Sequence, residues 1–402
     1  MRATLASHPR PRPHRRAIVA IAVAAVTIDT ALLGLIAPLL PEIERRTGAS
    51  EWALGASLAA YAVPIVLLSL PLGRLADSLG RRVLLIVGLL LAAAGSAVIA
   101  ASESLVLLML GRAIQGGGSA ASWIAALALV SDLAPPGRRG EAIGFALAAT
   151  GAGSIAGPAL GGVTADLLSF AAPFLIICCV SLALALAAAT VLPPDSGRRT
   201  PQAPAWATIR ASIGSGIGAV ATAMTLGGAC ALGLIEVVAP LDFDARLDLS
   251  SSAIGLLFAG SIAVDAALAP LGGRWGDRRG RRGPAVAGLA LTAASALLLA
   301  GLGGTLGAGL ALGVFGAGFS LTFSAAVPWL DEAFGEPERG FGYGVLNLLY
   351  GAGYTIGPLL GGVLLGVASA DAAYGLTAAA LGCGAGTLLL RPGASTTTAP
   401  SS

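Results

Sequence analysis

Two stretches, GAGSIAGPALGG at 151–162 and GAGYTIGPLLGG at 351–362, decide the fold of this chain because each is a copy of the other. Two further landmarks repeat nearly in the same register: 71–82 with 270–282, and Arg139-Gly140 with Arg339-Gly340. Three matched landmarks indicate two homologous halves. In an apolar chain, such a repeat favours a binding site on the axis between the halves.

The composition places the chain in a membrane. Hydrophobic residues make up 56% of the 402 residues and charged residues only 11%, whereas a soluble domain carries about 25% charged residues. All basic residues are Arg, the only histidines are His8 and His14 near the N-terminus, and the net charge is +3. The four cysteines show neither a disulfide framework nor a metal-ligand spacing. We therefore expect no bound metal and no nucleic-acid partner.

Twelve apolar stretches of about 19 to 28 residues can each cross a bilayer as a helix. They are 17–39, 52–72, 83–101, 104–131, 141–163, 171–193, 213–239, 251–272, 284–302, 306–329, 341–365 and 372–390. The expected organisation is a tail (1–16), a six-helix bundle (17–193), a linker (194–212), a second six-helix bundle (213–390) and a tail (391–402).

Arginine placement predicts the orientation. Of the 24 arginines, 20 lie in the tails or in the loops on the same side as the tails. Because cytoplasmic loops carry the excess of positive charge, we expect both termini and the linker to be cytoplasmic. The loops after spans 1 and 7 then face outside.

The segment 73–82, GRLADSLGRR, follows span 2 and is repeated as GRWGDRRGRR at 273–282. Its glycines allow a tight turn, Asp77 suits the positive N-terminus of a neighbouring helix, and its last two arginines can pair with carboxylates or lipid phosphates. This segment resembles the signature of the major facilitator superfamily. The resemblance implies a cytoplasmic gate in which Asp77 meets the chain near Gly340, and we expect Asp132 to pair with Arg81. The gate residues are Gly73, Arg74, Asp77, Gly80, Arg81, Arg82, Asp132, Asp277 and Arg281.

Span 5 carries small residues at regular spacing, which let two helices approach closely, and a proline that bends the helix. This pattern resembles the antiporter motif of the twelve-span drug:proton antiporter family, and span 11 repeats it. Its members are Gly144, Gly153, Gly157, Pro158, Gly161 and Gly162. The resemblance implies a packing role that marks exporters without contact to substrate.

Span 4 places Arg112 inside the bilayer, where a charge costs about 2.5–3.5 kcal/mol. The stretch Gly111 to Gly116 resembles the motif of the same family in that span. Arginine does not release a proton at working pH. We therefore expect Arg112 to bias a nearby carboxylate or to hold a hydrogen-bond network, with a purely structural role as the alternative.

Three acids lie inside spans: Asp29 in span 1, Glu236 in the outer part of span 7 and Asp265 in span 8, nearer the cytoplasmic end. With no Lys in the chain and no His in a span, carboxylates are the ordinary side chains able to carry a proton there near neutral pH. Burial favours the protonated form and a bound cation favours the ionised form. One Asp can then bind a proton or an organic cation in turn. A structural hydrogen bond to a neighbouring helix is the alternative for each acid.

Further stretches, including Ile28-Asp29-Thr30, Gly233 to Glu236 and Gly353 to Pro358, resemble vesicular monoamine transporters and bacterial multidrug exporters. The resemblance covers nearly the whole chain and implies that Asp29 and Glu236 bind an amine. The family's acids of spans 10 and 11 are replaced by Phe323 and Asn347, so proton exchange would use Asp29 and Glu236, with Asp265 as a candidate. Phe323, Asn347 and Tyr354 are candidates for the cavity lining, and a core role for the two aromatics is equally open.

These observations predict an all-α membrane protein of twelve transmembrane helices in two pseudo-symmetric six-helix bundles, the major facilitator fold. We expect a proton-coupled exporter of small cationic or lipophilic amines or drugs. The alternatives are a transporter of a neutral metabolite or sugar, a sensor on the same fold and an intramembrane enzyme. The last lacks metal-ligand spacing and a nucleophile elbow. We expect a monomer in the inner membrane, contacting lipids and using no cofactor beyond the proton gradient.

Overall fold

The computed structural model describes residues 12–133, 139–193, 210, 214, 216–334 and 339–390, and regular structure within these ranges is helical throughout. The long helices are α1 (Arg12–Gly34), α3 (Glu51–Leu79), α4 (Arg81–Ala100), α5 (Leu105–Leu133), α6 (Arg139–Leu167), α7 (Ala172–Val191), α9 (Gly216–Leu247), α10 (Ser251–Arg279), α11 (Arg282–Gly301), α12 (Gly304–Phe334), α13 (Arg339–Val367) and α14 (Ala370–Leu390). Two short elements, η1 (Ala37–Leu39) and α2 (Leu40–Thr47), follow α1. Eleven stretches of the described chain are long and apolar enough to cross a bilayer.

The twelve expected spans fall on the twelve long helices in order, but several helix ends differ. Span 1 is not one helix to residue 39, because α1 ends at Gly34 and the chain resumes in η1 and α2. Pro38 and Pro41 each stand in the first turn of the new element, where a missing N–H leaves no helical bond unmade. The tail expected at 1–16 also differs, since α1 begins at Arg12. The linker 194–212 and the tail 391–402 lie largely or wholly outside the described residues.

The gate segment is mostly helix, not loop. α3 continues to Leu79, and the turn falls at Gly80, whose φ of 88° suits glycine. The second half has the same turn at Gly280, with φ 83°. The expectation of a turn at Gly73 is therefore wrong. The two ends differ because hydropathy shows only where the chain leaves the hydrocarbon core of the bilayer. The backbone of α3 stays helical and hydrogen-bonded beyond that point.

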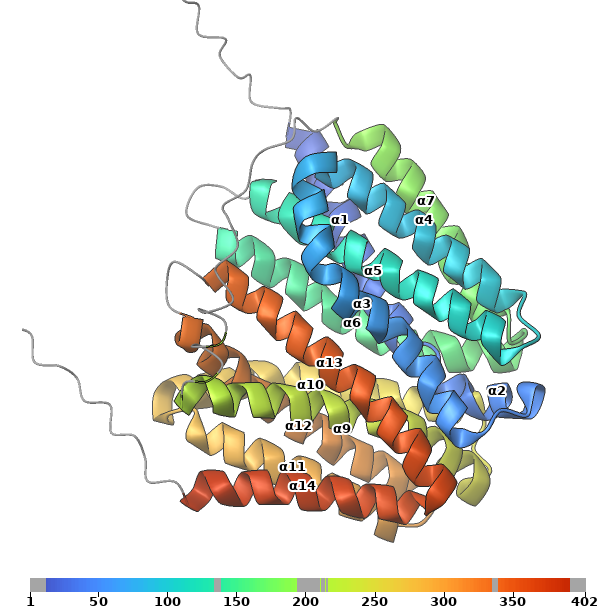
Figure 1. The fold of residues 1–402 in the computed structure, drawn as a ribbon, viewed down its shortest axis with the longest axis vertical. Helices are drawn as coiled ribbons and strands as arrows, with labels where there is room; N and C mark the ends of the chain where they lie inside the picture. Colours follow the sequence, from blue (N-terminus) through green and yellow to red (C-terminus); the bar gives the residue numbers. More distant parts are fainter. Residues whose placement is uncertain are drawn as a thin grey trace, which may run out of the picture.

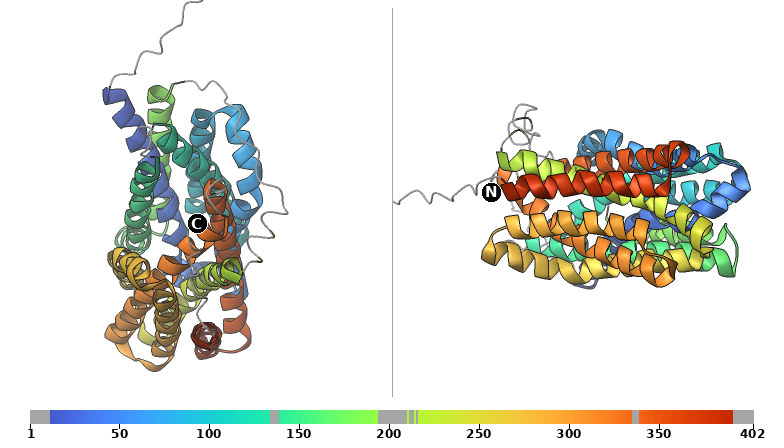
Figure 2. Two further views of the ribbon diagram at one scale, coloured as in Figure 1. Left: turned by 90° about the vertical axis from the view of Figure 1, so that its left-hand side faces the viewer. Right: turned by 90° about the horizontal axis from the view of Figure 1, so that it is seen from below.

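The helices form two bundles, α1–α7 and α9–α14, which Figures 1 and 2 show side by side. Two pairs of helices join them: α6 packs along α10, and α13 packs along α3. Both pairs make the same backbone contact. A methyl group on Gly55 would lie 2.2 Å from the carbonyl oxygen of Pro358, and one on Gly255 would lie 2.3 Å from that of Pro158. The bundles thus meet through contacts related by the internal repeat.

Within the first bundle, α6 lies against α1 along the glycines of span 5. A methyl group on Gly157 would lie 2.3 Å from the carbonyl oxygen of Ala31, a distance that only glycine permits. Gly153 and Gly161 approach α1 equally closely, Gly162 approaches α10, and Pro158 packs against Gly34. The surroundings of Gly144 lie outside the described residues. The described members of the motif therefore pack helices together.

The same seam in the second bundle fixes which residues correspond. Gly357 meets the carbonyl of Cys230 as Gly157 meets that of Ala31. α1 and α9 therefore correspond at an offset of 199 residues, one less than the offset between α6 and α13. By this count Asp29 corresponds to Gly228, and Glu236 corresponds to Ala37. The two acids lie on equivalent helices at inequivalent positions, about two turns or 12 Å apart along the axis.

Candidate functional site

Asp29 lies on α1 with 3% of its surface exposed. The hydroxyl of Ser122, on α5, lies 2.9 and 2.8 Å from its two carboxylate oxygens and donates to the carboxylate. The Tyr61 hydroxyl, from α3, donates to the main-chain carbonyl of Asp29 at 3.1 Å. Asp29, which sequence analysis singled out, is thus held through its carboxyl group by α5 and through its main chain by α3.

Arg112 is fully buried on α5. Its Nη1 donates to the carbonyl of Leu32 at 2.8 Å and to Gln115 Oε1 at 3.2 Å, and its guanidinium lies 4.3 Å from the centroid of the Tyr61 ring. Gln115 continues the network by donating to Ser96 at 2.9 Å. Arg112 therefore ties α1, α3 and α4 to α5, as the hydrogen-bond network expected for it requires.

Glu236 lies on α9 with 4% of its surface exposed and accepts a hydrogen bond from the Tyr354 hydroxyl of α13. Both groups are close enough to interact electrostatically with Arg112 of the other bundle. The structure therefore brings together three predicted residues, Arg112, Glu236 and Tyr354, where the two bundles meet. Asp29 is linked to Arg112 through Tyr61, whose hydroxyl bonds the Asp29 main chain and whose ring packs against the guanidinium.

Tyr354 stands at one end of a row of aromatic rings on α12 and α13. It stacks on Tyr350 at 6.3 Å between centroids, Tyr350 meets Phe323 edge-on at 5.9 Å, and Phe323 lies 4.4 Å from Phe319. Phe319 in turn lies 6.0 Å from Phe315. Aromatic faces attract organic cations and also pack against apolar groups. Two of these rings, Phe323 and Tyr354, were predicted from the sequence.

Two predicted residues form no side-chain hydrogen bond with these groups in the described structure, although Asp265 lies close enough to Tyr350 to interact with it electrostatically. Asp265 is half-buried in the middle of α10, where its main-chain carbonyl accepts a hydrogen bond from Ser320 at 2.9 Å. Asn347 is exposed on α13. Conversely, sequence reasoning missed Ser122, Tyr61 and Tyr350. These three stand in stretches of small or apolar residues that give no distinct signal.

The described gate residues lie on the side of the termini, and their arginines pair within their own bundles. Arg81 forms the expected ion pair with Asp132, and Arg281 pairs with Glu332 at the corresponding place in the second bundle. Arg82 and Arg282 donate to main-chain carbonyls near the ends of α7 and α14. Asp277 is exposed. The side chains of Arg74 and Asp77, and the surroundings of Gly340, lie outside the described residues, so a contact between the bundles there stays a prediction.

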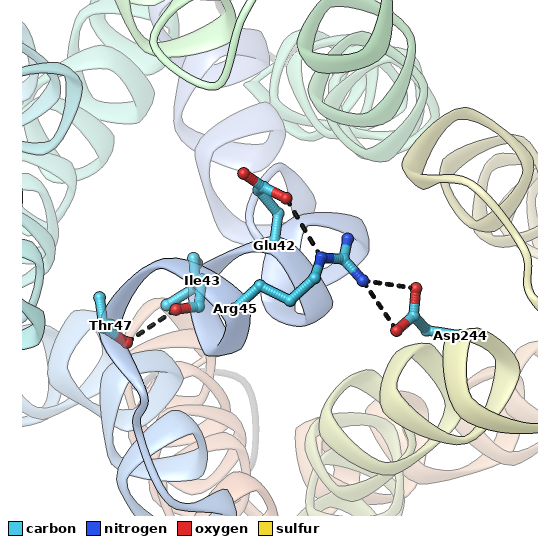
Figure 3. Close-up of polar contacts among 5 residues, drawn as sticks. All are labelled: Glu42, Ile43, Arg45, Thr47 and Asp244. Atoms are coloured by element: carbon cyan, nitrogen blue, oxygen red, sulfur yellow. Dashed lines mark hydrogen bonds and ion pairs between the residues drawn. The ribbon is translucent and has the colours of Figure 1, made fainter.

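On the opposite side, an ion pair joins the bundles directly. Arg45 Nη1, from α2, lies 2.9 Å from both carboxylate oxygens of Asp244 at the end of α9, and Arg45 Nε lies 3.3 Å from Glu42 (Figure 3). These residues line a polar cavity of about 510 Å³ that also includes Asp166 and Asp248. The face opposite the termini, which the arginine placement predicts to be the outer face, is thus closed by opposite charges from the two bundles.

A second contact across this face uses the start of a helix. Asp166, in the last turn of α6 and beyond the span expected at 141–163, accepts a hydrogen bond from the backbone N–H of Ser252 at 2.7 Å. Ser252 lies in the first turn of α10, whose free N–H groups favour a carboxylate. Partial burial alone would raise the pKa of Asp166, but hydrogen bonds from this turn outweigh burial and hold the pKa below the ordinary 3.8.

Comparison with known proteins gives this arrangement a family. The model of the Major Facilitator Superfamily matches residues 19–239 and 221–402. Multidrug resistance protein 1 of Bacillus subtilis (strain 168) is 24% identical over 83% of this chain and 86% of its own length. The tetracycline resistance protein, class G, of Vibrio anguillarum is 37% identical over 40% of this chain and 41% of its own. The probable vesicular acetylcholine transporter-B of Danio rerio is 27% identical over 54% of this chain and 46% of its own. The chain thus spans less than half the length of the last two relatives.

A solved structure shares the fold. The crystal structure of a bacterial homolog to the human lysosomal transporter Spinster, in an inward-facing and unoccupied conformation, matches with a TM-score of 0.77 at 15% identity, over 94% of this chain and 95% of that one. The twelve helices, the two repeat-related bundles and the family match agree with one another. The chain therefore belongs to the Major Facilitator Superfamily and is a multi-pass membrane transporter rather than an enzyme.

Proposed function

We propose that this transporter exports small cationic or lipophilic organic compounds in exchange for protons, by alternating access. The observation that carries the proposal is the burial of two carboxyl groups, Asp29 and Glu236, inside a chain that has no lysine. A buried carboxyl group is neutral when protonated and charged when ionised, and only the ionised form attracts a cation. Competition between proton and substrate for one carboxylate then couples their movements.

The surroundings of Glu236 support a substrate that combines positive charge with apolar surface. The Tyr354 hydroxyl binds this carboxyl group, and the aromatic row extends away from it. Relatives named for multidrug resistance, tetracycline resistance and vesicular acetylcholine transport fit a site of this mixed character. Proton entry supplies the drive, since each elementary charge crossing 100 mV contributes about 2.3 kcal/mol before any pH gradient.

The bundles would rock about this site. Arg45–Asp244 and Asp166–Ser252 hold the outer face closed, so outward opening must break both contacts. Asp77 and the start of α13 would close the cytoplasmic face in the alternate state. The proposal further places the protein as a monomer in the inner membrane, with no cofactor. It places both termini in the cytoplasm, because 20 of the 24 arginines lie on the side of the termini.

The test is uptake of a fluorescent organic cation into inside-out vesicles with an imposed pH gradient. Uptake by the wild type is expected to depend on the gradient and to be lost in Asp29→Asn. Asp371→Asn is the matched control, because this exposed aspartate at the start of α14 undergoes the same change. Uptake that persists in Asp29→Asn, or that ignores the gradient, would reject proton exchange through Asp29 and favour uniport. No uptake of the cation by the wild type would favour a neutral substrate such as a metabolite or sugar.

A further inference from the structure

The hydroxyl of Ser122 has one proton and three acceptor groups within reach: the Asp29 carboxylate, the carbonyl of Gly118 and, at 3.3 Å, the carbonyl of Ser119. It lies 2.9 and 2.8 Å from the Asp29 carboxylate oxygens and 2.9 Å from the carbonyl oxygen of Gly118, one turn earlier on α5. Ser122 is fully buried. A serine hydroxyl can donate to only one of these acceptors at a time, but it can accept a hydrogen bond while it donates.

We propose that Ser122 is a positioning residue that allows Asp29 to change its protonation state inside the closed bundle. When Asp29 is ionised, the hydroxyl proton of Ser122 points to the carboxylate. When Asp29 takes up a proton, the carboxylic acid donates to Ser122 Oγ, and the hydroxyl proton turns to the carbonyl of Gly118. In each state the mobile proton and the Ser122 hydroxyl proton both have an acceptor, so neither state leaves a buried donor without a partner. The inference rests on the proposed function only in that Asp29 exchanges protons.

The second bundle contains the same device without the acid. Thr322 corresponds to Ser122, and its hydroxyl donates to the carbonyl of Gly318 at 2.9 Å, as Ser122 can to Gly118. At the place of Asp29 the second bundle has Gly228, which offers no carboxylate. A hydroxyl group at this position can therefore donate to the carbonyl one turn earlier on its own helix in both bundles. Only in the first bundle can it donate to a carboxylate instead.

The backbone around the two hydroxyl groups is also alike. Gly88 of α4 lies so close to Ser122 that a methyl group on it would be 2.6 Å from the Ser122 backbone nitrogen. A methyl group on Gly288 would likewise be 2.4 Å from the backbone nitrogen of Thr322. Because a threonine fits beside Gly288, a threonine is expected to fit beside Gly88. The chain itself thus indicates a substitution that keeps the hydroxyl in place.

Few other ionisable side chains of the described residues stand on the helices around Asp29. Tyr61 of α3 donates to its main-chain carbonyl, and Arg112 of α5 is held by Leu32, Gln115 and the Tyr61 ring. The remaining such groups on these neighbouring helices are Glu51, Asp132, Asp166, Cys178 and Cys179. Ser122 supplies the hydrogen bond to the carboxylate itself.

The test follows the protonation of Asp29 directly, by infrared titration of the full-length protein in lipid vesicles. The band of the protonated carboxyl group is assigned by its loss in Asp29→Asn. In Ser122→Ala the ionised form loses its donor, so the midpoint of this titration is expected to rise by about one to two pH units. Ser122→Thr, which restores the hydroxyl, is expected to titrate as the wild type does. Thr322→Ala is the control in the second bundle and is expected to leave the midpoint unchanged.

The outcomes separate this inference from the proposed function. An unmoved midpoint in Ser122→Ala, an equal shift in Thr322→Ala or a failure of Ser122→Thr to restore the midpoint would overturn the role of Ser122. A shifted midpoint together with uptake that ignores the pH gradient would retain Ser122 and reject proton-coupled export. An Asp29 that shows no titration in the wild type would overturn both.

Discussion

Replacing Asp244 by asparagine is expected to shift the protein toward its outward-open state, because the substitution removes the ion pair with Arg45 and changes little else. The two side chains are 30% and 54% exposed, respectively, so water screens their attraction. Exposed pairs of this kind contribute about 0.2–1 kcal/mol. The ratio of outward-open to outward-closed molecules should therefore rise by a factor of about 1.5 to 5. The rise should shrink with salt as the charges are screened.

Distances between spin labels on the outer face measure this ratio. Glu103 is exposed in the loop between α4 and α5 of the first bundle, and Gly303 is exposed in the loop between α11 and α12 of the second. Cysteines at these two positions would carry the labels. The four native cysteines are first replaced by alanine. Pulsed electron paramagnetic resonance then gives the fraction of molecules at the longer distance, and Asp244→Asn is expected to increase that fraction at low salt.

Asp248→Asn provides the control. Asp248 lines the same outer cavity and loses the same charge, but the described structure gives it no ion pair with Arg45. Its φ of 51° also suits asparagine. An equal rise in this variant would show that net charge, not the pair, controls the outer face. A double-mutant cycle with Arg45→Ala and Asp244→Ala that yields no coupling energy would refute the reasoning outright.

Two further substitutions test the packing seam and the second acid. Gly157→Ala would place a methyl group 2.3 Å from the carbonyl oxygen of Ala31; α1 and α6 must part by about 1 Å, and the midpoint of thermal unfolding should fall as overpacking costs about 1–3 kcal/mol. Tyr354→Phe removes the hydroxyl that Glu236 accepts from. The lost hydrogen bond should cost about 1–3 kcal/mol of stability at neutral pH and reduce cation uptake into vesicles.

Both substitutions have controls nearby. A methyl group on Gly151, in the same helix as Gly157, would first meet the Cβ of Ala266 at 4.0 Å. Because alanine is also the better helix former, Gly151→Ala should not lower the unfolding midpoint. Tyr350→Phe keeps the ring of Tyr350 and removes a hydroxyl that forms no hydrogen bond with Glu236 in the described structure. If Tyr350→Phe and Tyr354→Phe reduced uptake equally, the hydrogen bond to Glu236 would not explain the loss.

The repeat and the hydropathy of the chain predicted the helices and their order, because each span is a local property of about twenty residues. They misplaced helix ends where the chain leaves the hydrocarbon, as in α3, since a helix stops where its backbone turns and not where its side chains become polar. Asp29, Arg112 and Glu236 were found because charge inside a span is rare. Ser122 was not found, because its role depends on how far α5 is rotated and shifted against α1. Backbone contacts between distant segments set that geometry, and no local pattern records it.

The contacts between Gly55 and Pro358 and between Gly255 and Pro158 are one contact made twice. In a symmetric homodimer such an isologous interface binds both copies to the same sequence, so every change appears on both sides of the axis. Here one chain carries both copies, and each can vary alone. The paired glycine contacts at the axis could therefore be kept while the two halves came to differ elsewhere. Asp29 in the first half corresponds to Gly228 in the second, and Arg112 corresponds to Leu312. This difference between the halves limits the cost of burying charge. Each buried charge carries a desolvation cost, and a chain that kept the same charge in both halves would carry that cost twice.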